Sequence, residues 1–446
     1  MIQLRLLCSR WGWGLLLLLT AVTACTQPQP SPSTPIVSPT MEVSMVTAVP
    51  TSAQTAASAS PSPASLNHTA TATLTPTTLA TLAAYPPPTG EGSEAYFPIV
   101  SFAEASPTPT ATATATAVPT PTPSPTPTPI PIVDFPAVRA QLQVNGQELA
   151  YVKIGFHTAV GGNGAGLDEW MRQLDAAGVP FFLKSVGNAQ PLYFAQELMK
   201  QSGVPHTLVY RRSGNEYDVP LYDLPADEAA RIHWQRHIEV WPPELDPSLV
   251  WIETTNEIDK TRSEWMAQFA LTTAQLALAD GYKYAAFSWA SGEPEPTDWQ
   301  TPAMLQFLRL AAQYPDRIAI SLHEYSYLTD DIGHEYPHKI GRFQELFRIC
   351  DQYGIPRPTV LITEWGWTYE NVPSPEAALR DIAWAAHMYA QFPQVKGAAI
   401  WYLGGGFANI ANQAQRLIYP VMVYALTNYF AIPTAQPPIN PEQFRP

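Results

Sequence analysis

The segment DQYGIPRPTVLITE, residues 351–364, joins the end of a predicted helix to a predicted strand. Gly354 can take the left-handed conformation that ends a helix, and Pro356 prevents the helix from restarting. The run TVLIT that follows is short, apolar and rich in β-branched residues, as expected of a strand. Glu364 comes directly after this run. The segment therefore predicts a carboxylate at the carboxyl end of a strand.

The same order of helix, glycine and apolar strand recurs in DAAGVPFFLK (175–184), KQSGVPHTLVY (200–210) and LADGYKYAAFSW (278–289). Strands that alternate with helices pair in parallel through right-handed crossovers, and eight such units close into a (β/α)8 barrel. An open doubly wound sheet is the alternative, but GFHTAVGGNG (155–164) lacks the glycine fingerprint expected after its first strand. The predicted strands lie near residues 151–156, 179–184, 206–211, 248–255, 283–289, 317–323, 358–363 and 396–402.

The first 25 residues have the pattern of an export signal. Arg5 and Arg10 precede a short apolar stretch at 15–19, which cannot cross a bilayer core of about 30 Å. The run Val-Thr-Ala-Cys that ends at Cys25 resembles the bacterial lipobox, which implies that Cys25 is lipidated. The alternative is an ordinary signal peptide cut near Ala24, which would release a secreted protein. We predict a lipoprotein-type signal over 1–25 and an exported, lipid-anchored protein.

Proline, threonine, serine and alanine make up most of the next hundred residues. No lysine or arginine occurs between residues 26 and 133. Such a composition cannot bury enough apolar surface to offset the entropy of ordering, so we predict a disordered stalk over 26–134. A globular domain is predicted over 135–434, and a Pro-rich tail over 435–446.

Charge and cysteine content limit the partners. The formal net charge of −14 and the absence of a basic run argue against nucleic acid or anionic lipid as a ligand. Cys8 leaves with the signal, and neither a lipidated Cys25 nor Cys350 has a partner for a disulfide. The domain must therefore be stabilised by a large core. We expect a monomer that touches the membrane only through Cys25.

Polar and aromatic residues gather at the predicted carboxyl ends of the strands, where the chemistry of such barrels is located. Two of them, Glu257 and Glu364, are carboxylates from different strands. Hydrolysis of a glycosidic bond needs such a pair, because one group protonates the leaving oxygen while the other attacks or activates water. In chain order these strand-end residues are His157, Lys184, Arg211, Asn256 with Glu257, Ser288 with Trp289, His323 with Tyr325, Glu364 with Trp365, and Trp401.

Four of these strand ends carry a family resemblance. Asn256-Glu257, His323-Glu324-Tyr325, Glu364-Trp365-Gly366 and Trp401 close the fourth, sixth, seventh and eighth predicted strands. In this order they resemble the retaining β-glycosidases of glycoside hydrolase clan A, most of all family 5, over residues 135 to about 432. Two departures are Ile258-Asp259 where the family commonly has proline, and Lys184 in place of an arginine.

The resemblance implies a role for each matching residue. Glu257 would be the acid/base, Glu364 the nucleophile, Asn256 a ligand of the sugar 2-hydroxyl, Tyr325 the group that orients the nucleophile, and Trp401 a floor for the sugar. Other residues predicted to bind substrate are His157, Lys184, Arg211, Trp289 and His323.

A retaining mechanism places the two carboxyl groups about 5 to 5.5 Å apart. Glu257 must be protonated when the leaving oxygen departs, so we expect the second carboxylate to raise the pKa of Glu257. Arg211 and Tyr325 are expected to keep Glu364 ionised. Glu253 has the same strand parity as Glu257 and should lie deeper in the barrel, paired with Lys184 or Lys153.

Other motifs receive structural interpretations. His233 and His237 are spaced as in zinc-binding helices, but Trp234 stands where such helices carry their general base, so we predict surface histidines. The glycines 404–406 should let a loop clear a sugar chain. We expect neither a cofactor nor a catalytic metal, because His157 alone does not form the H-x-H pair of metal-dependent barrels.

These observations together predict an exported glycoside hydrolase that cleaves a β-linked glycan with retention. The alternative is a surface glycan-binding protein on the same barrel that has no turnover. A barrel that acts on phosphorylated metabolites conflicts with export and with the acidic cleft.

Overall fold

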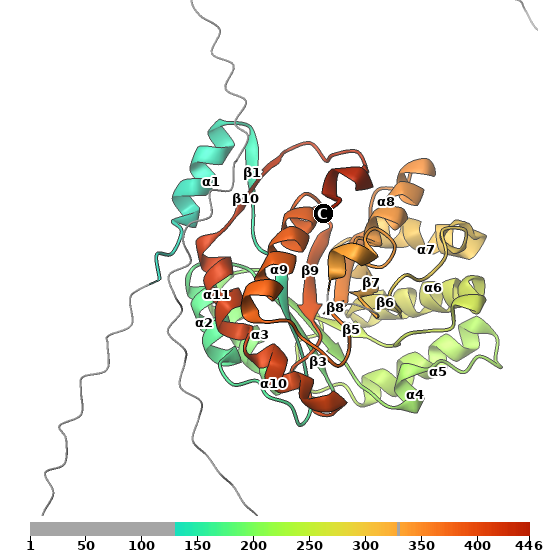
Figure 1. Ribbon diagram of the computed structural model, residues 1–446. Coiled ribbons are helices and arrows are strands. Elements are labelled where there is room, and N and C mark those ends of the chain that lie inside the picture. Colours follow the sequence, from blue (N-terminus) through green and yellow to red (C-terminus); the bar gives the residue numbers. More distant parts are fainter. Residues whose placement is uncertain (1–129, 328–330) are drawn as a thin grey trace, which may run out of the picture. The chain divides into compact units, whose positions relative to one another are not determined.

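The computed structural model describes residues 130–327 and 331–446. Eight parallel strands in chain order, β2 to β9, close into a barrel, and helices surround it (Figure 1). The protein is a TIM barrel, as predicted. The strands are β2 Ile154–Ala159, β3 Phe182–Val186, β4 Thr207–Arg211, β5 Val250–Glu253, β6 Lys283–Trp289, β7 Ile318–Tyr325, β8 Thr359–Gly366 and β9 Val395–Ile400.

A helix follows each barrel strand, and two short helices precede α5 and α11. The helices after the barrel strands are α2 Leu167–Ala176, α3 Gln190–Ser202, α4 Asn215–Asp218, α5 Ala226–Glu239, α6 Ser263–Asp280, α7 Pro302–Gln313, α8 Phe343–Gln352, α9 Pro375–Ala390, α10 Ile410–Gln415 and α11 Ile418–Thr427. The predicted helix stops are confirmed: Gly203 and Gly281 end α3 and α6 with φ of 76° and 86°.

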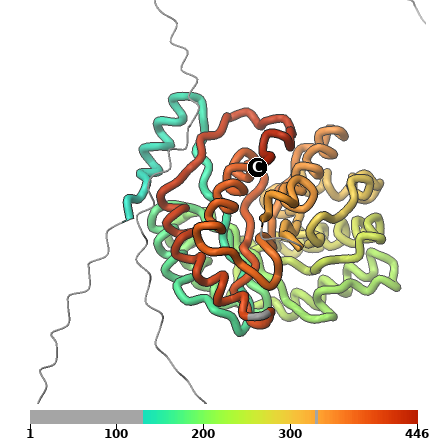
Figure 2. The backbone as a smooth tube through the Cα atoms, viewed as in Figure 1, coloured from blue at the N-terminus to red at the C-terminus, as the bar shows by residue number. Residues whose placement is uncertain are grey.

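One helix and two short strands outside the barrel were not predicted. Helix α1 (Phe135–Val144) leads into β1 (Gln147–Ala150), which pairs antiparallel with β10 (Phe430–Pro433). Figure 2 shows these first and last described segments side by side. Because β1 runs on into β2 through residues 151–153, the first barrel strand begins later than expected. The ribbon therefore lies on the amino-terminal side of the barrel strands, away from their carboxyl ends.

The barrel interior is layered according to strand parity. Its lower layer is apolar and takes one residue from each of seven strands, which are Phe182, Val209, Trp251, Ala285, Ala319, Leu361 and Ala399. Gly155 of β2 has no room for a side chain, because a Cβ there would lie 1.8 Å from the Phe182 carbonyl oxygen. Residues two positions further along the strands face the same interior one layer higher, except in β6, where a bulge places Ser288 there instead of Phe287. That upper layer contains the polar groups of the site.

The chain after β10 packs on the barrel. Phe444 is buried, and its carbonyl accepts a hydrogen bond from Trp384 Nε1 at 2.8 Å. Arg357 Nη1 donates to the Pro437 carbonyl at 3.1 Å. The predicted Pro-rich tail, residues 435–446, therefore packs on the barrel as part of the folded unit.

The predicted signal over 1–25, the lipidated Cys25 and the stalk up to residue 129 lie outside the described residues. Within the part of the chain that the structure describes, no helix is both long and apolar enough to cross a bilayer.

Candidate active site

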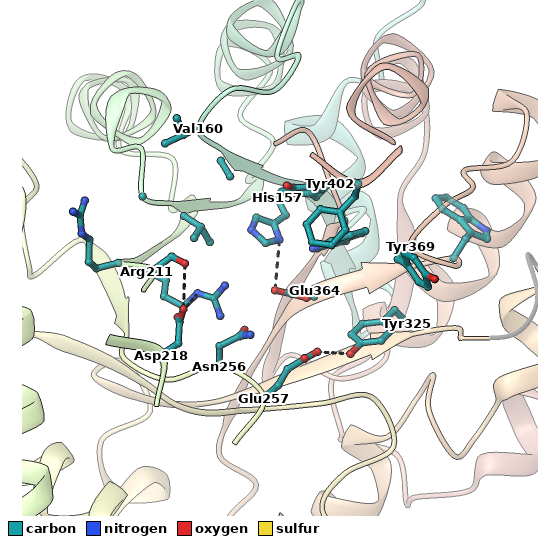
Figure 3. A pocket seen from close by; sticks show the side chains of 18 of the residues that line it. His157, Val160, Arg211, Asp218, Asn256, Glu257, Tyr325, Glu364, Tyr369 and Tyr402 are labelled. Carbon is teal, nitrogen blue, oxygen red and sulfur yellow. Dashed lines mark hydrogen bonds and ion pairs between the residues drawn. The ribbon is translucent and has the colours of Figure 1, made fainter. Parts of the chain in front are cut away.

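A pocket of about 680 Å³ opens at the carboxyl ends of the barrel strands (Figure 3). This volume lies in the usual range for small-molecule sites. The pocket brings together side chains from strands that are far apart in sequence. Among its lining residues are His157, Val160, Arg211, Asp218, Asn256, Glu257, Tyr325, Tyr327, Glu364, Trp367, Tyr369, Trp401, Tyr402 and Phe407.

The two predicted carboxylates face each other in this pocket. Glu257 follows β5 and its side chain is 41% exposed, whereas Glu364 in β8 is 9% exposed. His323 of β7 lies between them, with Nδ1 3.4 Å from Glu257 Oε1 and 3.6 Å from Glu364 Oε2. One oxygen of each carboxylate and one nitrogen of His323 all lie within 4.8 Å of one another. Two carboxylates at this separation can act on the same bond.

The local backbone conformation directs the side chains of both glutamates into the pocket. Glu257 has a φ of 45°, and its N–H donates to the Ser288 carbonyl at 2.8 Å. In β8 the pairing register shifts between Ile362 and Trp365. Because of this irregularity, two consecutive side chains both face the interior: Thr363 points into the barrel and Glu364 into the pocket. Both irregularities lie where catalytic residues are commonly found in strained or bulged backbone.

A buried ion pair supports Glu364 from below. Lys184 is fully buried, and its Nζ lies 2.8 Å from Glu253 Oε2 and 3.3 Å from Glu364 Oε1. The hydroxyls of Ser288, Ser321 and Thr363 donate to Glu253 Oε1 at 2.6–2.7 Å. Burial alone would raise the pKa of Glu253, but Lys184 and then Arg211 hold that pKa well below its usual range. The prediction of a buried Glu253 paired with Lys184 is confirmed. Lys184 itself lies beneath the pocket rather than lining it.

Lys153, the alternative partner of Glu253, lies elsewhere. Its Nζ donates to the carbonyls of Tyr389 and Phe392 at 3.1 and 3.0 Å.

Arg211 was expected to keep Glu364 ionised, but its ion-pair contacts are with Asp218 and Glu253. Its Nε lies 3.7 Å from Asp218 Oδ1 and 3.9 Å from Glu253 Oε2, and Figure 3 shows its guanidinium beside Asp218. Asp218 ends α4, and its carbonyl accepts from the Asn256 N–H at 3.1 Å. Sequence reasoning missed Asp218, because no motif marks a carboxylate in the loop after the third barrel strand.

Tyr325 also has a different partner from the one expected. Its hydroxyl donates a short hydrogen bond to Glu257 Oε1 rather than to Glu364, as Figure 3 shows. The Tyr327 hydroxyl lies 3.1 Å from the Tyr325 hydroxyl. The register shift in β7 between Leu322 and His323 changes how this strand end meets β8. Tyr325 therefore orients Glu257.

The expected direction of the pKa shift of Glu257 is wrong for the unliganded protein. The close contact with His323 is the largest cause that lowers the pKa of Glu257, to about 2, with contributions from Tyr325 and Arg211. These contacts and the charge of Arg211 stabilise the carboxylate more than its burial destabilises it. Glu257 is therefore ionised at neutral pH.

Several buried polar groups of the site lack hydrogen bonds. They are both ring nitrogens of His157 and of His323, Nε and Nη1 of Arg211, and Oδ1 of Asn256. Burial, followed by the charges of Lys184 and Arg211, lowers the pKa of His157 well below its usual value, so its ring is neutral. Buried polar groups without partners are costly in a native structure. The pocket is therefore suited to a ligand with many hydroxyl groups.

Trp401 lines the pocket, but Trp289 does not. Trp401 stacks on Tyr402 with ring centroids 4.5 Å apart and 15° between the planes. Trp289 is completely buried and stacks on Phe287 in the layer between barrel and helices. A bulge between these two residues, with φ of 80° at Phe287 and 51° at Ser288, turns Ser288 inward and Trp289 outward. The prediction that Trp289 contacts substrate is therefore wrong.

The glycines after β9 permit close packing of two loops. A Cβ on Gly405 would lie 2.6 Å from the Gly161 carbonyl oxygen, and one on Gly404 would lie 2.6 Å from the Ala159 Cβ. The Gly405 N–H donates to the Val160 carbonyl at 3.0 Å. We expected these glycines to leave room for a sugar chain. In the structure they allow close contact between the loops that follow β9 and β2.

His233 and His237 are buried rather than on the surface, which corrects the prediction. His233 Nε2 lies 2.6 Å from the Thr254 carbonyl oxygen, and His237 Nδ1 lies 2.9 Å from the His233 carbonyl oxygen. Burial lowers the pKa of His233 to about 4; burial and the nearby His233 lower that of His237 to about 3. Both rings are therefore neutral at physiological pH and pack α5 against the strand that ends near Glu257.

These histidines make the protein acid-sensitive. The unfolded chain takes up protons below about pH 6.5 while both folded rings stay neutral until about pH 4 or lower, so the free energy of unfolding falls as pH decreases through this window. We expect His237→Asn to reduce the slope of this free energy with pH by about 1.4 kcal/mol per pH unit, the value for one proton. Urea denaturation between pH 4.5 and 7 measures both slopes. Equal slopes would contradict the assignment.

Among the described residues, one group has ligand atoms close enough together to hold a divalent cation. It consists of Glu257, His323 and Glu364. The Lys184 ammonium 3.3 Å from Glu364 Oε1 already places a positive charge there and repels a second one. This trio is better suited to proton transfer than to holding a metal.

The fold and the site thus define a TIM barrel with paired carboxylates at the carboxyl ends of its strands. No family model matches the chain, and no curated protein matches it. Solved structures that match include an endo-β-1,4-glucanase from Xanthomonas axonopodis pv. citri, at 12% identity over 59% of this chain and 99% of the glucanase, with a TM-score of 0.35. Cel5A (EG2) from Hypocrea jecorina matches at 13% identity over 57% of this chain and 89% of its own, with a TM-score of 0.32.

The YdjI aldolase from Escherichia coli matches about as well. Its identity is 8% over 65% of this chain and 94% of the aldolase, with a TM-score of 0.30. None of these likenesses, at identities of 8–13% and TM-scores of 0.30–0.35, indicates a function for this chain. The function must therefore be argued from the site itself.

Proposed function

We propose that the protein is a retaining glycoside hydrolase that cleaves a β-linked glycan, with Glu364 as nucleophile and Glu257 as acid/base. One observation carries this proposal: one oxygen of Glu364 in β8 and one oxygen of Glu257, which follows β5, lie within 4.8 Å of each other across an open pocket. Retaining glycosidases hold their carboxyl groups about 5 to 5.5 Å apart, whereas inverting ones leave about 6.5 to 9.5 Å for a water molecule.

The reaction proceeds in two displacements at the anomeric carbon. An oxygen of Glu364 attacks this carbon while the bond to the leaving oxygen breaks, and the leaving oxygen takes the proton of Glu257. Glu257 then removes a proton from water, whose oxygen attacks the same carbon and releases Glu364. Lys184 holds Glu364 Oε1 by a hydrogen bond and leaves Oε2, on the His323 side, for the attack.

Groups around the carboxylates supply contacts for the sugar. Asn256 and His157 line the pocket with polar atoms that make no hydrogen bond within the described part of the chain. Trp401 offers an aromatic face, on which the apolar face of a sugar ring stacks. In this proposal the barrel acts outside the cell, carried by the lipid-anchored stalk that the sequence predicts.

The charge of Glu257 favours a second candidate, a glycan-binding protein without turnover. A pKa of about 2 leaves Glu257 ionised at neutral pH, whereas an acid catalyst must be protonated. A bound sugar would cover the exposed side of Glu257 and exclude water, which raises the pKa of a carboxylate. His323, 3.4 Å from Glu257 Oε1, is placed to pass it a proton. In the enzyme proposal Glu257 therefore becomes the acid only in the complex.

Hydrolysis of defined substrates by the full chain tests the proposal. We expect turnover of at least one among 4-nitrophenyl β-glycosides and β-glucan, mannan and xylan oligosaccharides, with the β-anomer released first, because two inversions restore the configuration. NMR spectra recorded within the first minutes follow the anomer before mutarotation. Release of the α-anomer would exclude Glu364 as nucleophile. Binding of one glycan without turnover would favour the second candidate.

A further inference from the structure

The pocket rim carries an unusual amount of exposed aromatic surface. Tyr327, Tyr369 and Phe407 are 44%, 54% and 54% exposed, and all three line the pocket. They come from the loops after β7, β8 and β9. Large apolar groups grouped at a site mark a binding surface, whereas scattered ones do not.

Phe407 stands in a loop that is held firmly at its base. The Leu403 N–H donates to the His157 carbonyl at 2.8 Å, and the Gly405 N–H to the Val160 carbonyl at 3.0 Å. The Tyr402 hydroxyl donates a short hydrogen bond to the Gly405 carbonyl. The turn that follows is therefore presented from a fixed base.

The backbone at Phe407 is strained. Its φ is 48°, in the left-handed region, and it follows Gly406 with a φ of 86°. A bulky residue in this region is a genuine outlier, because its side chain clashes with the backbone. With 54% of Phe407 exposed, burial offsets little of this cost in the unliganded protein. Such strain at a pocket rim is evidence for a functional constraint on the side chain.

The strained conformation places the phenyl ring against Trp401. The ring centroids lie 4.9 Å apart at 69°, an edge-to-face contact. Tyr402 covers one face of Trp401 with its own ring. Trp401 and Phe407 thus form a two-ring surface that opens into the pocket.

The topology decides on which side of the scissile bond this surface lies. Strand β9, which precedes the Phe407 loop, lies beside β8 and four positions away from β5 around the closed barrel. The acid Glu257 follows β5, and its partner Tyr325 contacts Tyr327. Because the acid must face the leaving group, Phe407 lies on the side of the sugar that becomes attached to Glu364.

We propose that Phe407, together with Trp401, binds the second sugar on this non-leaving side and makes the protein selective for oligosaccharides over single glycosides. This inference rests on the proposed function. The ligand is a neutral β-linked disaccharide unit or longer chain, whose C–H face packs on the aromatic rings.

Pairs of substrates with the same leaving group isolate this contact. The pairs are the 4-nitrophenyl β-glucoside and β-cellobioside, the β-mannoside and β-mannobioside, and the β-xyloside and β-xylobioside. For the pair that is hydrolysed, we expect wild-type kcat/KM to be at least about tenfold higher for the disaccharide. Phe407→Ala should lower this ratio by about tenfold, the upper range of aromatic contacts.

Three variants separate this role from a structural one. Phe407→Tyr should keep the ratio, because it keeps the ring. Phe407→Gly should lose the ratio without loss of thermal stability, because glycine accepts the positive φ that phenylalanine does not. Tyr419→Ala removes another exposed ring, 53% accessible on α11, and should leave the ratio unchanged.

The outcomes distinguish the two proposals. Equal ratios for wild type and Phe407→Ala, with hydrolysis of a pair intact, would overturn the role of Phe407 and leave the glycosidase standing. Absence of hydrolysis of every pair by the wild-type chain, together with absence of turnover of longer β-glucan, mannan and xylan chains, would overturn both.

Discussion

Replacement of Glu364 by Gln is expected to lower kcat by about four orders of magnitude or more while sugar binding is retained. The carboxamide keeps the shape of the carboxylate and can still accept the hydrogen bond of Lys184, but it is a poor nucleophile. Losses of this size follow removal of a nucleophile in other hydrolytic enzymes. Steady-state kinetics on the preferred substrate measures the loss, and calorimetric titration with the same sugar measures binding.

A rescue experiment tests the role of Glu364 directly. In Glu364→Ala the space of the carboxylate is free, so azide can attack the anomeric carbon from the same side. One displacement inverts the configuration, and the expected product is an α-glycosyl azide, which NMR identifies. Glu376→Gln, on the exposed first turn of α9, is the matched control and should retain full activity. Unchanged turnover in Glu364→Gln would rule out the assignment.

Lys184→Met is expected to destabilise the fold by about 3–5 kcal/mol, because it leaves the buried carboxylate of Glu253 without its cation. Glu253 Oε2 would lose the Lys184 contact at 2.8 Å and keep only Arg211 at 3.9 Å. Methionine is similar to lysine in length, so the loss comes mainly from charge. Urea denaturation followed by tryptophan fluorescence measures the free energy of unfolding.

A double-mutant cycle and a surface control sharpen this result. Lys184→Met combined with Glu253→Gln removes both charges and should be less destabilising than Lys184→Met alone. Lys200→Met breaks the exposed Lys200–Glu197 pair at 3.1 Å and should cost about 1 kcal/mol or less. If Lys184→Met costs no more than Lys200→Met, the buried network does not stabilise the barrel as its geometry indicates.

The barrel could be predicted because its evidence is local. A glycine that ends a helix and an apolar run that follows it are adjacent in sequence, as in residues 351–364, and eight repetitions leave few topologies. The β1–β10 ribbon could not be predicted, because its partners are separated by nearly the whole described chain and each strand is only four residues long.

The predicted site residues came from their positions at strand ends, and the structure brings most of them into one pocket. His157, Arg211, Asn256, Glu257, Tyr325, Glu364 and Trp401 line it. Prediction failed where the backbone departs from regular strand geometry. The bulge at Phe287 and Ser288 sends Trp289 into the core, because one extra residue reverses the alternation of side chains.

The contacts between side chains within the site could not be predicted from the sequence either. Tyr325 contacts Glu257 rather than Glu364, and Arg211 contacts Asp218, which no motif indicated. The pKa of Glu257 follows from these distances, since a hydrogen bond or ion pair acts over a few ångströms that strand parity does not specify.

Periodicity and helix stops are properties of neighbouring residues, so they suffice to predict the TIM barrel and the positions of Glu257 and Glu364 at the carboxyl ends of two strands. The folded chain was needed to show which groups contact these glutamates, what charge Glu257 carries, and that Phe407 lies against Trp401. Those properties depend on bulges, register shifts and loop contacts, in which residues far apart in the chain meet.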